Sequence, residues 1–194
     1  MFKAGSMVAV AGSRQLPGGM PDAVGSVAGA LLDAGHSLAV GCCQGADEAV
    51  LRAAVARGCG HRLSVLCAFG PSGAGACGLS AVAAVEAAAA AGACVNWWAG
   101  GGARVPLRAR LAGRTRAVVG AAAGGLMACF GSAESRGSLL ACRRAHALGR
   151  PVLALPPGGV AEALPVLGPG AWQPVGRLGG VPVMRWCQAQ ACLL

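Results

Sequence analysis

Gly12, Ser13 and Arg14 form the first of several short segments whose residue types suit phosphate chemistry. They directly follow the apolar run 8–11. Glycine allows the backbone to approach a ligand closely, the serine hydroxyl and free amides can hold phosphate oxygens, and arginine can neutralise charge. The segment lacks the repeated glycines of a dinucleotide-binding turn and the lysine of a P-loop. Taken alone, the segment is therefore either a plain turn or a phosphate contact of another kind.

A second glycine-containing segment, with Gly41, Gln44, Gly45 and Asp47, follows the apolar run 37–40. The carboxyl ends of neighbouring parallel strands share one edge of a sheet, so the two segments are expected to face one crevice. Asp47 stands at the start of a predicted helix. Its carboxylate either caps that helix or accepts hydrogen bonds from a ribose, and both roles stay open.

A third segment contains Gly131, Ser132, Glu134, Gly137 and Ser138 and again lies between an apolar run and a predicted helix. The helix start would present backbone amides to an anion. Glu134 could act as a general acid or base, or could bind a sugar hydroxyl. Because no second carboxylate stands nearby in the sequence, we favour binding, and assign Glu134 a catalytic role only if the protein is a hydrolase.

Arginine dominates the charge of the chain, which has a formal net charge of +9. Five arginines lie within residues 104–116, with no acidic residue among them. Such a run forms either a solvated helix face or an anion-binding surface. Arginine is also frequent in proteins from GC-rich genomes, so the charge alone is weak support for an anionic partner.

Strand-like and helix-like segments alternate along residues 8–155. The strand-like segments are continuous apolar runs, which is typical of a parallel sheet covered by helices on both faces. The sequence therefore predicts an α/β fold with a Rossmann-like, doubly wound, mostly parallel sheet. We predict strands over 8–11, 37–40, 63–69, 93–95, 125–130 and 151–155, and helices over 21–34, 46–57, 79–91, 106–122 and 137–148.

Residues 1–158 are interpreted as one Rossmann-like domain, and residues 159–194 as an extension rich in proline and glycine. The extension could form a hairpin packed on the domain, or an interface. The adjacent Trp97 and Trp98 could cover a bound base, but packing or an oligomer contact is the favoured interpretation because tryptophan is enriched at interfaces.

The chain has 194 residues, of which 55% are hydrophobic, mostly alanine. Glycine, proline and asparagine interrupt the long uncharged stretches, so we expect a cytoplasmic protein without a membrane partner. The ten cysteines include no C-x2-C pair, so we expect no metal site and no cofactor. Cys67 and Cys129 stand in apolar runs and are predicted to be buried.

Four stretches together resemble the DNA-processing protein A family, and more broadly the SLOG superfamily of Rossmann-like proteins, which also includes the LOG nucleotide hydrolases. They are VAVAGSR, the GxxxGAD that opens a helix, residues 111–119, and ESRGSLLACRRAHALGRPVLALPPG. The resemblance covers residues 7–158 and implies a set of phosphate-binding positions. These are Gly12, Ser13 and Arg14 on the first loop, Gly41, Gly45 and Asp47 on the second, Arg114 and Arg116 on an Arg-x-Arg motif, and Gly137 and Ser138 on the last loop.

We hypothesise that the chain binds a nucleotide or a nucleotide-derived ligand at these loops. Two alternatives stay open: single-stranded DNA binding, and hydrolysis of a nucleotide N-glycosidic bond. The LOG signature Pro-Gly-Gly-x-Gly-Thr-x-x-Glu is absent, and Phe130-Gly131-Ser132-Ala133 stands in its place. We therefore expect a binding protein more than an enzyme, and a homo-oligomer by analogy with the family.

Overall fold

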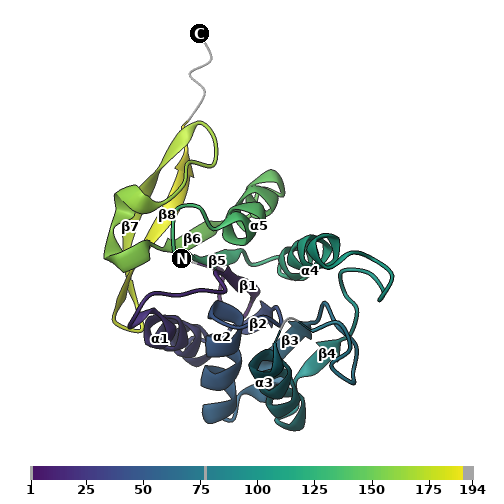
Figure 1. Cartoon of the computed structure of the whole chain (residues 1–194). Helices are drawn as coiled ribbons and strands as arrows, with labels where there is room; N and C mark the ends of the chain where they lie inside the picture. Colours follow the sequence, from purple (N-terminus) through teal and green to yellow (C-terminus); the bar gives the residue numbers. More distant parts are fainter. Residues whose placement is uncertain (1, 77, 190–194) are drawn as a thin grey trace.

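The computed structural model describes residues 2–76 and 78–189. Its eight strands form one sheet in the order β4-β3-β2-β1-β5-β6-β8-β7 (Figure 1). The strands are β1 (Met7–Gly12), β2 (Ser37–Val40), β3 (Leu63–Leu66), β4 (Cys94–Asn96), β5 (Leu126–Cys129), β6 (Val152–Leu155), β7 (Gly170–Leu178) and β8 (Val181–Gln188). The helices are α1 (Met20–Asp33), α2 (Ala46–Ala56), α3 (Leu79–Ala90), α4 (Leu107–Ala121) and α5 (Arg136–Ala147), with single 3-10 turns at Gly60–Arg62, Pro157–Gly159 and Ala161–Ala163.

The first six strands are mutually parallel, and β1 lies at the centre between β2 and β5. Strands β2, β3 and β4 lie on one side of β1, and β5 and β6 lie on the other. The loops after β1 and β5 therefore diverge and leave a crevice between them, as is usual for doubly wound sheets. The predicted α/β class, with a mostly parallel Rossmann-like sheet, is confirmed.

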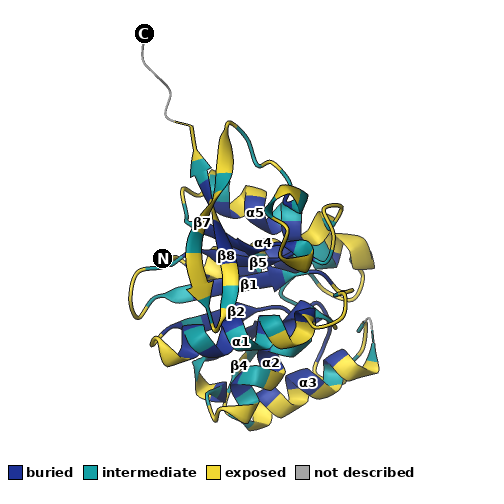
Figure 2. Ribbon diagram, turned by 90° about the vertical axis from the view of Figure 1, so that its left-hand side faces the viewer, coloured by how far each residue is buried: buried dark blue, intermediate teal, exposed yellow. Residues whose placement is uncertain are grey.

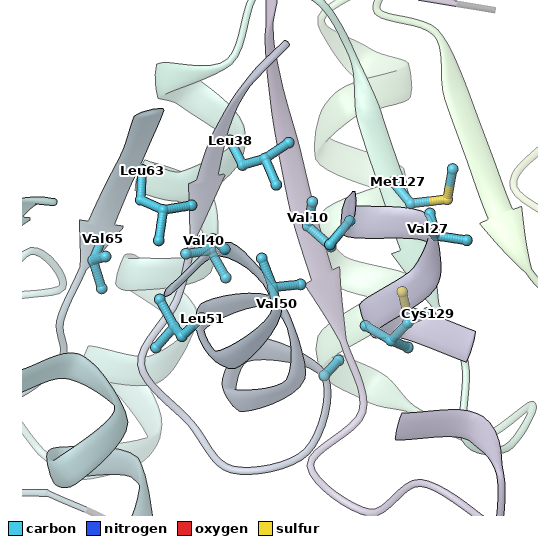
Figure 3. Close-up of a cluster of buried hydrophobic side chains, with 14 of the residues drawn as sticks. Val10, Val27, Leu38, Val40, Val50, Leu51, Leu63, Val65, Met127 and Cys129 are labelled. Atoms are coloured by element: carbon cyan, nitrogen blue, oxygen red, sulfur yellow. The ribbon is translucent and has the colours of Figure 1, made fainter. Parts of the chain in front are cut away.

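Two separate apolar cores pack on opposite faces of this sheet. Val10, Val40 and Val65 point toward the layer formed by α1, α2 and α3 (Figure 3). Strand residues of the opposite parity, such as Ala9 and Ala128, point toward α4 and α5. Side chains alternate between faces along a strand, so a strand buried on both faces is apolar throughout. Figure 2 shows these buried residues between exposed outer helix surfaces.

The third strand is shorter than predicted and ends at Leu66 rather than Phe69. Residues 67–69 are nevertheless buried. The backbone of Ala68 is occupied by partners from other elements: its N–H donates to Cys42 Sγ at 3.1 Å, and its carbonyl accepts from Arg110 Nη1 at 2.8 Å. The buried apolar segment therefore extends beyond Leu66, where strand β3 ends. Cys67 and Cys129 are fully buried, as predicted.

Strands β7 and β8 form a hairpin that continues the sheet beyond β6. Strand β8 pairs antiparallel with β6 at Leu153↔Arg185 and Ala154↔Met184. The rings of Trp172 and Trp186 contact edge to face with centroids 5.4 Å apart. The segment after residue 158 thus shares the sheet and the second core with the preceding residues. No helix in the described part of the chain is long and apolar enough to cross a membrane.

Candidate phosphate-binding cleft

An open cleft of about 1080 Å³ lies at the carboxyl edge of the central strands. Its walls come from the loops after β1, β2 and β5, from one flank of α4, and from the first turn of α5. The sequence-predicted residues that line it are Gly12, Ser13, Arg14, Gln44, Arg114, Gly131, Ser132, Glu134, Gly137 and Ser138. The structure therefore brings the three segments singled out in the sequence to one site.

Hydroxyl groups join the loop after β1 to the loop after β5. Ser13 Oγ lies 2.5 Å from Ser135 Oγ and accepts a hydrogen bond from the Gly131 N–H at 2.8 Å. Gly131 has no room for a side chain, because a Cβ there would overlap the Gln15 carbonyl. We call these contacts between the two loops the clasp. Ser13, which makes both of them, is only 9% exposed.

The N-terminus of α5 supplies backbone donors to the cleft. Among the described residues, none accepts a hydrogen bond from the amides of Arg136, Gly137 or Ser138. All three residues line the cleft. The Ser138 hydroxyl is turned inward and donates to the Cys129 carbonyl at 3.4 Å, and Ser138 is fully buried. The exposed residues Arg136 and Gly137 therefore carry the amides that a ligand can reach. Free amides at a helix start bind anions through both hydrogen bonds and the helix dipole.

The glycine loop after β2 lies behind the first loop, and only part of it reaches the cleft. The Ala46 N–H at the start of α2 donates to the Ser13 carbonyl at 3.1 Å. Gly45 has φ 82° and packs so closely on the backbone of Ser13 and Arg14 that a Cβ would overlap it. The Ser13 carbonyl of the first loop thus occupies one of the amides at the start of α2. Within the second loop, Cys43 and Gln44 are the residues that line the cleft.

Asp47 and Arg114 form a buried ion pair beneath the cleft. Arg114 Nη1 lies 3.0 Å from Asp47 Oδ2, which also accepts from the Cys43 N–H at 3.0 Å. The side chains of Arg114 and Asp47 are 8% and 4% exposed. Gly41 is required beside the pair, because a Cβ there would overlap the guanidinium. The second loop and α4 are locked together by this contact.

The charges of the pair follow from its surroundings. Burial lowers the pKa of Arg114, but Asp47 together with Cys43 and Cys42 outweighs this effect and holds that pKa above its ordinary value. Burial raises the pKa of the Asp47 carboxyl, while Arg114 and the Cys43 N–H oppose the rise. A hydrogen bond with Cys42, and then burial, raise the pKa of Cys43, whose sulfur accepts from Arg114 Nη2 at 3.1 Å. Cys43 is therefore a neutral thiol at the cleft wall.

Four of the sequence-predicted site residues do not line the cleft: Gly41, Gly45, Asp47 and Arg116. The first three build the support described above. Arg116 is exposed on α4 but outside the cleft. Contact between these four residues and a ligand stays a prediction, and the geometry favours a supporting role for the three in the second loop.

Two cleft arginines, Arg108 and Arg136, were not among the predicted site residues. Both are exposed and line the cleft together with Arg14. Arg108 belongs to the arginine run of 104–116, but only the structure shows which face of the helix meets the cleft. Glu134 is the one acidic residue lining the cleft.

Comparison with known proteins gives a match in structure and none in sequence. No family model matches the chain, and no curated protein matches it. DNA processing protein A (DprA) from Streptococcus pneumoniae superposes with a TM-score of 0.59 at 23% identity, over 84% of this chain and 59% of that one. DNA processing protein A from Helicobacter pylori, a protein with a described single-stranded DNA binding mode, gives a TM-score of 0.60 at 15% identity, over 79% and 66%.

The chain spans about three fifths of the length of the first of these proteins and about two thirds of the second. Because both identities are low, the similarity is a likeness of fold alone. Nevertheless, it agrees with the resemblance found in the sequence. The chain therefore has the Rossmann-like α/β fold found in DNA processing protein A.

Proposed function

We propose that the cleft binds the phosphodiester backbone of single-stranded DNA. One observation supports this proposal above all. The free amides at the start of α5 and the exposed guanidinium groups of Arg14, Arg108 and Arg136 line the same open cleft. Backbone amides and arginine are the groups that proteins use on phosphates. The single-stranded DNA binding of the Helicobacter pylori protein, which has a similar fold, supports the same ligand class.

The size of the cleft favours a strand over a single nucleotide. Its volume of about 1080 Å³ lies just above the roughly 300–1,000 Å³ usual for small-molecule sites. It is also open to solvent, as a site for a continuing chain must be. A polymer could therefore enter and leave without a free end being enclosed.

Charge outside the cleft points in the same direction. Residues 99–150, which carry α4 and α5, contain nine arginines and one acidic residue. Arg116, Arg143 and Arg144 are exposed on the outer surfaces of these two helices. A strand leaving the cleft over this layer would meet further positive charge, which a mononucleotide is too short to use.

A nucleotide or nucleotide-derived ligand is the second candidate for the same cleft. Glu134 favours it, because a lone carboxylate beside a phosphate cradle can accept hydrogen bonds from sugar hydroxyls. Cleavage of the N-glycosidic bond would add a catalytic role for this residue. Incubation of nucleoside monophosphates with the protein, followed by chromatography for released base, tests that activity, and Glu134→Gln is its control.

Fluorescence anisotropy of a labelled oligo(dT) strand tests the proposed function. We expect saturable binding by the wild-type chain and a loss of about 5- to 20-fold in affinity for Arg14→Ala, since one charge-assisted phosphate contact is removed. Arg52→Ala is the matched control, because Arg52 is exposed on α2 and pairs with Glu48 away from the cleft. Equal affinities of the two variants, or displacement of the strand by low concentrations of a nucleoside monophosphate, would contradict the proposal.

A further inference from the structure

The two adjacent tryptophans after β4 have different surroundings. Trp97 packs on the first core, with its ring 5.9 Å from that of Phe69. Trp98 belongs to neither apolar core and is partly exposed. A tryptophan normally stabilises a fold by burying its large apolar surface. Trp98 buries only part of that surface and leaves the rest accessible to solvent.

The backbone of Trp98 has an unfavourable conformation. Its φ of 58° makes it the one residue other than glycine, within the described part of the chain, that has a positive φ. A bulky side chain in this region is strained and persists only where surrounding contacts impose it. Such positions concentrate at ligand-binding sites.

Contacts specific to the indole hold Trp98 in place. The guanidinium carbon of Arg110 lies 5.2 Å from the centre of the ring, a cation–π contact. Arg110 is itself 6% exposed and donates to the carbonyls of Ala68 at 2.8 Å and Gly75 at 3.5 Å. A Cβ at Gly70 would stand 2.7 Å from the indole Nε1, so glycine there leaves room for the ring.

The indole lies at the same edge of the sheet as the cleft. Trp98 follows the carboxyl end of β4, and the cleft opens at the carboxyl ends of the central strands. Helix α4 separates them: Arg110 meets the indole, while Arg108 and Leu111 line the cleft. A helix with its side chains is about 10–12 Å wide, which sets the separation. The cleft itself is lined by no aromatic side chain among the described residues.

We propose that Trp98 is a stacking surface for a nucleobase of the strand whose backbone occupies the cleft. This inference rests on the proposed function and assigns the base contact that the cleft lacks. Stacking on an aromatic ring is a sequence-tolerant way to hold single-stranded nucleic acid, and the guanidinium of Arg110 fixes the ring beforehand. The phosphates would then be bound on one flank of α4 and a base on the other.

Paired binding measurements on oligo(dT) and on an abasic strand of the same length test this inference. Trp98→Gly suits the left-handed backbone and so preserves the loop. We expect it to weaken oligo(dT) binding roughly 5- to 150-fold and abasic-strand binding less than about twofold. Trp98→Phe should recover most of the affinity for oligo(dT). The salt dependence of binding should not change, because no phosphate contact is removed.

Trp172→Phe is the matched control, because Trp172 lies in the β7–β8 hairpin, at the other end of the sheet. If Trp98→Gly weakens the two strands equally, or leaves oligo(dT) binding unchanged while the wild-type chain binds, the stacking role is wrong and the proposed function stands. If the wild-type chain binds neither strand, both proposals fail.

Discussion

The two helical layers of this protein cover the same sheet but differ in charge. Residues 20–98, which contain α1, α2 and α3, have five acidic residues against three arginines. Residues 99–150, which contain α4 and α5, have nine arginines against one glutamate. Both layers bury an apolar core, although the core under α4 and α5 is richer in alanine. An apolar core does not require the charge asymmetry, whereas the DNA binding proposed above would account for it.

The layers meet at the carboxyl edge of the sheet, where Arg114 of α4 pairs with Asp47 of α2. This is the one ion pair among the described residues in which both side chains are buried. Arg114 therefore differs from the exposed arginines: it is buried, and it joins the two layers. The cleft forms where these two layers are joined.

The largest expected effect comes from removing this link. Asp47→Ala leaves the Arg114 guanidinium buried without its carboxylate, so the free energy of unfolding should fall by about 3–5 kcal/mol. Urea denaturation followed by circular dichroism measures it. The double variant Asp47→Ala, Arg114→Met removes both charges and should be more stable than Asp47→Ala alone. A loss below about 1 kcal/mol for the single variant would mean that the two layers are not joined here.

Charge reversal on each layer tests the asymmetry directly. Arg143→Glu with Arg144→Glu on α5 should weaken binding of a long oligo(dT) strand about 10- to 30-fold, because two attractive charges become repulsive. Arg52→Glu on α2 with Arg57→Glu, at the residue that follows α2, is the matched pair, since both residues are also exposed and belong to the α1–α3 layer. We expect that pair to change affinity less than about threefold. Equal losses would show that net charge, and not its location, controls binding.

The clasp between the loops after β1 and β5 should have a smaller effect. Ser13→Ala removes the acceptor of the Gly131 N–H and the partner of Ser135. The free energy of unfolding should fall by about 1–2 kcal/mol, because the Gly131 amide loses its partner. Ser13→Thr keeps the hydroxyl and is the control. An unchanged unfolding midpoint for Ser13→Ala would show that solvent replaces the clasp.

The smallest expected effect comes from replacing either of two exposed helical glycines. Gly137 in α5 and Gly120 in α4 both have open space where a Cβ would stand, so alanine at either should raise the free energy of unfolding by up to about 0.5–1 kcal/mol. Only Gly137 lines the cleft. We therefore expect Gly137→Ala, and not Gly120→Ala, to weaken oligo(dT) binding, by about two- to fivefold. Identical affinities would place the strand away from the α5 amides.

Most of the fold could be predicted because its determinants are local. Continuous apolar runs indicated the strands, and glycines such as Gly35 and Gly149 marked helix ends, so most boundaries agree within a residue or two. Neither β7 nor β8 was among the predicted strands, although a hairpin was one of the alternatives for this segment. The nine residues of β7 are largely exposed and include Pro174 and Gly176, so they form no apolar run. The place of β7 in the sheet depends on pairing with β8, which no local pattern shows.

The candidate site could be located from the sequence, but not the role of each residue in it. The pairing of Asp47 with Arg114 spans 67 positions, and nothing near either residue indicates it. The different positions of Arg114 and Arg116 could have been foreseen, because residues two apart on a helix do not share a face. The strained backbone of Trp98 is visible only in the structure.

The salt dependence of oligo(dT) binding tests most directly the claim that this cleft and its basic layer hold a phosphodiester backbone. Affinity is measured by anisotropy between roughly 50 and 200 mM salt, for the wild-type chain and for the α5 charge-reversal variant. We expect wild-type affinity to fall about 10- to 200-fold over this range, since several phosphates are neutralised, and we expect a shallower dependence for the variant. Binding that ignores salt, or no binding of the strand at all, would contradict the account.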